Sequence, residues 1–197
     1  DENVAFFSFS DAMIKVGLSV PQVVVVSKDR TAYLQEDLGN ETLFDRVKAN
    51  PEAADFRKNV LPLYFRAVED LVALQLAAHA VVPYENAFPA PSYDQSSILA
   101  ALHYFFYSFV KQHPTLEVNE YELLKALQHF AEEISEMPSD AFMYRDFQAR
   151  NIMIHQEKLY YIDFQGGRKG PLQYDLISLL YKVKTALSPS LRKEIKS

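Results

Sequence analysis

Residues 144–151 read Tyr-Arg-Asp-Phe-Gln-Ala-Arg-Asn, and an Asp-Phe pair, Asp163 and Phe164, follows twelve residues after the Asn. An Asp (Asp146), an Asn five positions on (Asn151) and a second Asp before Phe form the spacing of phosphoryl-transfer sites. Each residue alone is more simply a turn, cap or solvated strand-end residue. Their order and spacing together predict a site that transfers a phosphoryl group.

The chain between Asn151 and Asp163 predicts a β-hairpin. Residues 151–154 and 159–162 are short strand-like runs, and a polar turn joins them. Because a hairpin brings the start of one strand beside the end of the next, we expect Asn151 and Asp163 to lie close together. Their oxygens suit Mg²⁺, with ATP phosphates and water as the remaining ligands. Asp146, in the loop before the hairpin, is expected to accept or orient a substrate hydroxyl.

The composition limits the class of protein. The 197 residues are 49% hydrophobic and 23% charged, which is typical of a globular chain with a real core. The net charge of −6, without a basic stripe, argues against a nucleic-acid or membrane partner. No apolar run reaches the ~18 residues of a membrane span. The lack of Cys excludes disulfides and thiolate metal sites and fits a reducing compartment, so we expect a cytoplasmic protein.

The N-terminal residues predict a helix and two strands. Apolar residues recur at helical spacing over 2–16, and Gly17 follows as a natural end. Residues 22–26 contain a valine run that predicts a buried strand, and residues 31–35 predict a second, antiparallel strand. The loop 36–40 is a plausible boundary between a small lobe and a larger one.

The rest of the chain is mostly helical until the hairpin, so the predicted fold class is α+β. The expected elements are a helix over 60–80, a Pro-rich loop over 83–91, a helix from Asp94 or Ser96 to about 111, a helix from Asn119 to about 136, a flexible cationic loop over 166–170 and a helix over 172–187. The cluster Tyr104-Phe105-Phe106-Tyr107 is expected in the core rather than on a sugar-stacking surface. The five histidines show no metal-ligand spacing.

Three segments together resemble the aminoglycoside-phosphotransferase/choline-kinase superfamily: residues 144–151, 162–165 and 170–175. The Asp-Phe-Gln at 163–165 resembles the bacterial branch related to N-acetylmuramate/N-acetylglucosamine 1-kinases. Residues 36–39 resemble the hinge between the two lobes of this family. The resemblance implies a protein-kinase-like, aminoglycoside-phosphotransferase-like fold. Its truncated N-lobe would be 1–40, and its helical C-lobe would be 41–197, with the catalytic loop and hairpin at 142–165.

The resemblance also implies roles for particular residues. Asp146 would be the catalytic Asp. Asn151 and Asp163 would hold Mg²⁺, with ATP as the phosphoryl donor. Backbone groups of Glu36 and Leu38 would bind the edge of the adenine.

Other residues would support this site. Asp175 would be a buried Asp that holds the catalytic loop, although a helix N-terminal Asp favoured by the macrodipole explains it equally well. Glu2 lies where the family places the acidic partner of the phosphate-binding Lys, but Glu is common in a first helical turn. Arg168 or Lys169 could meet phosphate or an anionic substrate, and a solvated loop is the simpler interpretation.

The catalytic loop departs from the family pattern at two positions. Tyr144 replaces the usual His before Arg145, and Gln148 stands where many relatives have His. Arg145 and Gln148 are expected to support the loop. The phosphate-covering loop of the family and its strand Lys lie upstream of the first helix, where this chain begins. We therefore expect an internal piece of a longer kinase.

Two functions remain open from the sequence. The joint pattern of Asp146, Asn151 and Asp163 favours an ATP-dependent kinase that phosphorylates a hydroxyl of a small molecule, a sugar or amino sugar. The missing upstream strand keeps a non-catalytic binding or adaptor module as the alternative. A protein kinase is disfavoured, because Gly170 and Pro171 follow Asp163 too closely for a long activation segment. The sequence reveals neither the acceptor nor the oligomeric state.

Overall fold

Helices surround three two-stranded sheets in the part of the chain that this computed structural model describes, residues 2–50, 52–182 and 187–197. The α-helices are α1 (Glu2–Lys15), α2 (Leu43–Ala49), α3 (Ala53–Asn59), α4 (Leu61–Val81), α5 (Gln95–Phe105), α6 (Glu120–Ser135), α7 (Gln173–Leu180) and α8 (Pro189–Lys196). Shorter helical turns are η1 (Tyr84–Asn86), the π-helical η2 (Phe106–Val110) and η3 (Ala149–Asn151). The antiparallel sheets pair β1 (Val23–Val26) with β2 (Tyr33–Gln35), β3 (Phe142–Met143) with β6 (Arg168–Lys169), and β4 (Ile152–His155) with β5 (Lys158–Tyr161). This is the predicted α+β fold.

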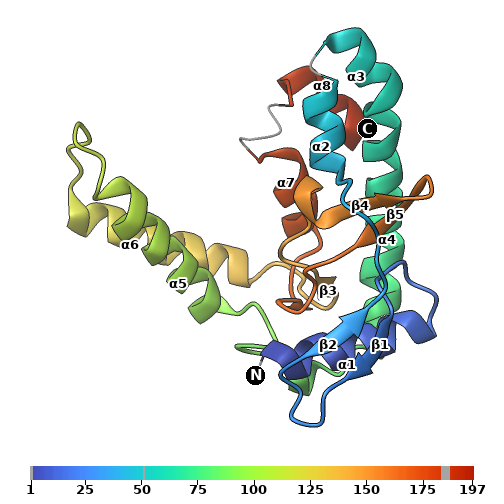
Figure 1. The fold of residues 1–197 in the computed structure, drawn as a ribbon. Coiled ribbons are helices and arrows are strands. Elements are labelled where there is room, and N and C mark those ends of the chain that lie inside the picture. Colours follow the sequence, from blue (N-terminus) through green and yellow to red (C-terminus); the bar gives the residue numbers. More distant parts are fainter. Residues whose placement is uncertain (1, 51, 183–186) are drawn as a thin grey trace.

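Helix α1 packs one apolar stripe into the core. Ala5, Phe9 and Met13 recur every four residues, and each is fully buried. Gly17 follows the helix with a φ of +78°, a conformation that glycine adopts without the steric cost of a Cβ. The helix lies beside β1 and β2 at one end of the molecule (Figure 1). The prediction of a helix over 2–16 is confirmed to within one residue.

The prediction of a buried first strand is wrong about its burial. The strand β1 forms, but Val24 and Val25 are 68% and 52% exposed, and every residue of β2 is exposed. A run of four valines is typical of a strand covered on both faces. Among the described residues this sheet has only two strands, so the covering layers that the valine run implies are incomplete.

The long helix α4 runs through the centre of the core. Pro62 lies in its first turn, where a missing N–H costs nothing. Leu71, Leu74 and Ala78 are buried along one stripe, and Asp70 accepts a hydrogen bond of 2.7 Å from the Tyr161 hydroxyl, which ties β5 to the helix. The predicted helix over 60–80 is confirmed. Within the described residues, no helix has the length and apolar character needed to cross a membrane.

The hairpin β4–β5 forms as predicted from the sequence. Residues 152–155 pair with residues 158–161, which leaves a two-residue turn of Gln156 and Glu157. Both turn residues have positive φ, +50° and +60°, the backbone that matches the right-handed twist of the flanking strands. Arg66 of α4 donates to the Glu157 carbonyl at 3.3 Å and holds the turn in place.

Helices α5 and α6 form a pair that projects from the rest of the molecule (Figure 1). The predicted caps are present at both starts. Asp94 accepts from the Ser97 N–H at 2.8 Å, and Asn119 accepts from the Glu122 N–H at 3.3 Å.

The prediction that residues 104–107 lie in the core is wrong for three of the four. Phe106 is 2% exposed, whereas Tyr104, Phe105 and Tyr107 are 74%, 49% and 45% exposed. Each helix of a projecting pair buries mainly the face that meets its partner. Four consecutive side chains point around the helix, so they cannot all be covered.

The segment 166–170, predicted as a flexible loop, is instead ordered by pairing. β6 bonds to β3, and the Gly170 N–H donates to the Ala141 carbonyl at 3.1 Å. On its other side, Lys169 exchanges backbone hydrogen bonds with residues 91–93. The glycine-rich composition indicated a loop, but these partners lie far away in the sequence and leave no local signal.

The predicted helix over 172–187 is too long. Helix α7 ends at Leu180, and Tyr181 is its C-cap residue. Residues 183–186 lie outside the described residues. Helix α8, which the sequence analysis did not predict, begins at Pro189 after Ser188, whose side chain accepts from the Leu191 N–H.

Gly167 is a position where any side chain should destabilise the fold. An added Cβ would lie 2.3 Å from Cζ of Phe142, which is fully buried, and 3.0 Å from the Phe164 carbonyl oxygen. We expect Gly167→Ala to lower the free energy of unfolding by about 1–3 kcal/mol. The neighbouring Gly166→Ala is the matched control, since its Cβ would meet only the Arg145 side chain at 3.7 Å. Equal urea midpoints for the two variants would contradict this prediction.

Candidate functional site

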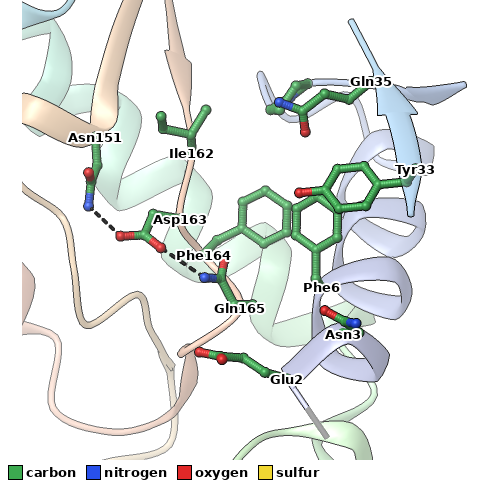
Figure 2. A pocket seen from close by; sticks show the side chains of 11 residues that line it. Glu2, Asn3, Phe6, Tyr33, Gln35, Asn151, Ile162, Asp163, Phe164 and Gln165 are labelled. Carbon is green, nitrogen blue, oxygen red and sulfur yellow. Dashed lines mark hydrogen bonds between the residues drawn. The ribbon is translucent and has the colours of Figure 1, made fainter. Parts of the chain in front are cut away.

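Two adjoining cavities lie between β2 and the end of β5. The first, of about 370 Å³, is lined by α1, β2 and residues 162–165 (Figure 2). The second, of about 410 Å³, is lined by residues 35–39 together with Met153 and Ile162. Gln35 and Ile162 border both cavities. The two cavities therefore adjoin, and residues 36–39, which resemble a hinge, line one of them while Asp163 lines the other.

Asn151 and Asp163 meet at the base of the hairpin. The Ile162 N–H donates to the Asn151 carbonyl at 3.1 Å, which continues the strand pairing by one step. As a result, Nδ2 of Asn151 lies within 3.0 Å of Oδ2 of Asp163 and 2.9 Å of the Asp146 carbonyl oxygen. The three residues of the opening motif are thus directly connected.

The donor set at this point fits Mg²⁺. Asn151 and Asp163 both line the first cavity, and they supply one amide oxygen and one carboxylate. These are hard oxygen ligands, which Mg²⁺ takes together with phosphate and water. Within the described residues there is no group of three or more His, Cys, Asp or Glu side chains that could hold a metal. Asn151 and Asp163 would supply two ligands, and phosphate and water could complete the coordination of a cation here.

Two site residues have a strained backbone. Arg145 and Asp163 have φ values of +76° and +69°, in the left-handed region that costs a non-glycine residue about 1–3 kcal/mol. Such strain persists only where surrounding contacts impose it, and here it lies on both sides of the Asn151 amide. The backbone strain at Arg145 and Asp163 therefore lowers the stability of the fold, and the contacts around Asp146 and Asp163 must offset this cost.

The residues after Asp163 fix the orientation of its carboxylate. Phe164 is fully buried and stacks on Phe6 of α1, with ring centroids 5.5 Å apart and planes 13° apart (Figure 2). Gln165 donates through Nε2 to Oδ1 of Asp163 at 2.8 Å. With Asn151 on Oδ2, each carboxylate oxygen accepts one amide hydrogen bond. The Gln after Phe164 thus has a local structural role.

Tyr144, which replaces the usual His, links the catalytic loop to the strand before Asp163. Its hydroxyl donates to the Ile162 carbonyl at 2.6 Å. Burial raises the pKa of Tyr144 well above 10, and the nearby charges of Asp163 and Asp175 act in the same direction. The phenol therefore stays protonated and remains a donor. With Tyr in place of His, a hydrogen bond still joins the catalytic loop to the residue before Asp163.

Asp146 is held by Gln148, the other departure from the family pattern. Nε2 of Gln148 donates to Oδ1 of Asp146 at 3.0 Å, and Gln148 is 5% exposed. Among the described residues, Oε1 of Gln148 is buried without a hydrogen-bond partner. One carboxylate oxygen of Asp146 is thus engaged by the protein, and no described residue donates to the other.

Asp175, at the start of α7, is fully buried beneath the catalytic loop. Its carboxylate accepts hydrogen bonds of 2.8 Å from the backbone N–H groups of Tyr144 and Arg145. Gln75 of α4 donates to the same carboxylate at 2.8 Å and to the Leu172 carbonyl at 3.1 Å. Burial raises the pKa of Asp175 to about 6, although the hydrogen bonds from Tyr144, Gln75 and Arg145 act in the opposite direction.

Asp175→Asn is expected to lower kcat by about 10–100-fold, because an Asn amide nitrogen would face a backbone N–H and one bond to a charged acceptor would be lost. In the wild type, activity should fall as the pH drops below about 6, where Asp175 takes up a proton. The folded-state pKa is higher than the unfolded value of 3.8, so the folded chain binds this proton more tightly. The contribution of Asp175 to the free energy of unfolding therefore decreases as the pH rises from about 4 to about 6.

Measurements of kcat and urea unfolding between pH 4.5 and 8 check both effects. The Asn variant should lack the stability slope and the acid limb that belongs to Asp175. Identical pH profiles for kcat and for unfolding in both proteins would contradict the assignment.

The segment proposed as a hinge borders the second cavity. The Glu36 N–H donates to the Gln22 carbonyl at 2.8 Å, so it is not available to a ligand. Within the described residues, the Glu36 carbonyl and the Leu38 N–H have no hydrogen-bond partner. One acceptor and one donor therefore remain on the backbone beside this cavity, the pair of groups that the edge of an adenine can use.

The structure places Glu2 at the first cavity and Arg168 away from both cavities. Glu2 is exposed and lines the first cavity with Asp163, and none of the residues lining that cavity is a Lys (Figure 2). The prediction that Arg168 lies in a solvated loop is wrong, because it is 2% exposed and donates to the carbonyls of Gly166 and Phe88. Burial lowers the pKa of Arg168, and the charge of Arg145 adds to this effect. Arg168 joins two loops and does not line either cavity.

The sequence analysis predicted no site contact for three residues that have one. Gln165 donates to Asp163, Gln75 donates to Asp175, and His155 lies 3.2 Å through Nδ1 from the Leu38 carbonyl. Gln165 follows the Asp-Phe pair directly, so its polar side chain was a visible signal. Gln75 and His155 reach their partners across about a hundred residues, and no local pattern marks them.

Solved structures place this fold among the kinase-fold phosphotransferases. A choline/ethanolamine kinase family protein from Mesorhizobium loti is similar with a TM-score of 0.62 and 15% identity, over 98% of this chain and 58% of that chain. An aminoglycoside phosphotransferase in a ternary complex with ADP and hygromycin B is similar with a TM-score of 0.56 and 14% identity, over 95% of this chain and 64% of that chain. At these identities the likeness shows the fold.

Residues 5–196 match the sequence model of the phosphotransferase enzyme family, and the chain belongs to that family. Curated relatives include N-acetylmuramate/N-acetylglucosamine kinases from Neisseria meningitidis serogroup B, 28% identical over 83% of this chain, and from Pseudomonas aeruginosa, 26% identical over 90% of this chain. The matched parts are 46% and 48% of those proteins, so this chain spans about half the length of these relatives.

Proposed function

We propose that this protein is an ATP-dependent phosphotransferase that phosphorylates a hydroxyl of a small molecule, a sugar or amino sugar. The observation that carries the proposal is the connected set of Asp146, Asn151 and Asp163 beside a cavity that adjoins the cavity lined by the hinge-like segment. Membership of the phosphotransferase family supports the reaction. The names of the curated relatives support the acceptor class. A cytoplasmic location, where ATP is abundant, is part of the proposal.

The residues would divide the chemistry among them. Asp146, whose second oxygen accepts no hydrogen bond from a described residue, would orient the acceptor hydroxyl and take its proton. Asn151 and Asp163 would hold Mg²⁺, which supplies positive charge beside the transferred phosphoryl group. Glu36 and Leu38 would bind the adenine edge through their free backbone groups. Asp175 and Gln148 would keep the catalytic loop and Asp146 in this geometry.

The test is ATP turnover by the full-length protein across a panel of sugars and amino sugars, with and without Mg²⁺. We expect metal-dependent ADP release that requires one class of acceptor. A parallel titration with ATP, by calorimetry, separates an enzyme from a kinase-fold adaptor. Absence of metal-dependent nucleotide binding by the full-length protein would overturn the proposal and favour the adaptor.

A further inference from the structure

The residues that follow the hinge-like segment pair with β4, and one residue of the segment itself, Leu38, contacts the end of that strand. The Ile154 N–H donates to the Glu41 carbonyl at 2.8 Å, and Thr42 forms an antiparallel bridge with Met153. The attachment nearest the second cavity comes from a side chain. Nδ1 of His155 lies 3.2 Å from the carbonyl oxygen of Leu38, a residue that lines that cavity.

The direction of this hydrogen bond fixes the tautomer of His155. A carbonyl oxygen only accepts, so Nδ1 must carry the hydrogen and donate it. The ring comes from the last residue of β4, packs edge-on to Tyr160 of β5 with centroids 6.1 Å apart, and is half-buried. It is therefore held by the hairpin that also positions Asn151 and Asp163. Its cross-strand neighbour is Lys158, at the other side of the turn.

The peptide between Leu38 and Gly39 is held on both sides, because its N–H donates to Oδ1 of Asp37 at 2.9 Å and its carbonyl accepts from His155. Without these bonds Gly39, which has a φ of +75°, could adopt other backbone conformations at little cost. A bond that holds the carbonyl between Leu38 and Gly39 limits rotation there, and with it the direction of the adjacent Leu38 N–H. That N–H is the donor without a partner beside the cavity.

We propose that His155 is a positioning residue, which orients the hinge so that the Leu38 N–H and the Glu36 carbonyl meet the base of the nucleotide. This inference rests on the proposed function, because it assigns the second cavity to the base of ATP. Under this proposal the β4–β5 hairpin positions two parts of the nucleotide site: the hinge that binds the base, through His155, and the proposed metal ligands Asn151 and Asp163. His155 touches neither the phosphates nor the acceptor and is not a catalytic residue.

The experiment compares three substitutions at His155. We expect His155→Ala to raise the KM for ATP about fivefold, the effect of one neutral hydrogen bond, while kcat changes less than about twofold. His155→Asn places an amide N–H near the position of Nδ1 and should restore a KM within about twofold of the wild type. His155→Gln places its amide near the position of Nε2 and should behave like the Ala variant.

Base discrimination provides a second measurement. A loosened hinge should lower the ratio of kcat/KM for ATP over GTP in the Ala and Gln variants but not in the Asn variant. His129→Ala is the matched control, because His129 is an exposed residue of α6 that lies beside the carboxylates of Glu132 and Glu133. Thermal melting of each variant separates a hinge effect from a loss of folding. If the Ala variant does not fold, the Asn and Gln pair still tests the inference.

The outcomes distinguish the inference from the function on which it rests. An unchanged KM for ATP in both the Ala and Gln variants, with an active wild type, would overturn the role of His155 alone. A kcat loss that exceeds the KM effect would also overturn it. A wild type that binds no nucleotide would overturn the proposed function, and the inference with it.

Discussion

Asp163→Ala is expected to reduce kcat by at least about a thousandfold, because its carboxylate is the charged member of the proposed pair of Mg²⁺ ligands, Asn151 and Asp163. The same change should remove the Mg²⁺ dependence of nucleotide binding. Folding should be affected little, since Nδ2 of Asn151 keeps its hydrogen bond to the Asp146 carbonyl and Gln165 is only half-buried. Steady-state kinetics and calorimetric titration with ATP, each with and without Mg²⁺, measure these effects.

The matched control for this variant is Asp11→Ala. Asp11 lies on α1 and pairs at the surface with Lys15, and an exposed ion pair of this kind contributes about 0–1 kcal/mol. Its removal tests the loss of one negative charge without a change at the metal site. Turnover by Asp163→Ala at the level of Asp11→Ala would show that the proposed metal ligand is not one.

Helix positions could be predicted from the sequence because their signals are local. Gly17 ends α1, and Asp94 and Asn119 cap α5 and α6 through side chains three residues from the N–H groups they bind. The hairpin β4–β5 was equally readable, since a four-residue polar break separates two apolar runs. In each case the residues that determine the element lie within a few positions of it.

Burial could not be predicted in the same way, because it depends on distant partners. The valines of β1 predict a strand correctly, but burial of Val24 and Val25 would need other elements packed on the faces of the sheet. Residues 104–107 lie on a projecting helix pair, which no local pattern reveals. The segment 166–170 contains three glycines and indicates a loop, yet β3 and the loop before α5 pair with it.

In the candidate site, too, the features with a local sequence signal could be predicted, and those that depend on distant residues could not. Asp146, Asn151 and Asp163 could be proposed from spacing alone, because a hairpin converts a sequence interval into proximity. The sequence left two interpretations of Asp175 open: an Asp that favours the start of a helix, or a buried Asp that holds the catalytic loop. In the structure its carboxylate accepts hydrogen bonds from the backbone of that loop, as the second interpretation requires. Gln75 and His155 carry no sequence signal, since polar residues in a long helix or at a strand end are usually solvated.

Asp146→Asn should separate catalysis from nucleotide binding. We expect kcat to fall by about 10²–10⁴-fold, the usual contribution of a positioned general base, because a neutral amide cannot take the acceptor proton. The affinity for ATP in the presence of Mg²⁺ should remain within a few-fold of the wild type. The proposed metal ligands Asn151 and Asp163 should stay in place, since Asn151 bonds to the backbone carbonyl of residue 146 and not to its side chain.

The opposite behaviour of the two Asp variants is the decisive comparison. Asp163→Ala should lose both turnover and metal-dependent binding, whereas Asp146→Asn should lose turnover alone. Gln148→Leu provides a graded control, because it removes the hydrogen bond to Oδ1 of Asp146 but leaves the carboxylate. Its kcat should fall by about tenfold, between those of the wild type and Asp146→Asn. If Asp146→Asn weakened ATP binding as strongly as it lowered kcat, Asp146 would be a structural residue of the loop, and the proton would need another acceptor.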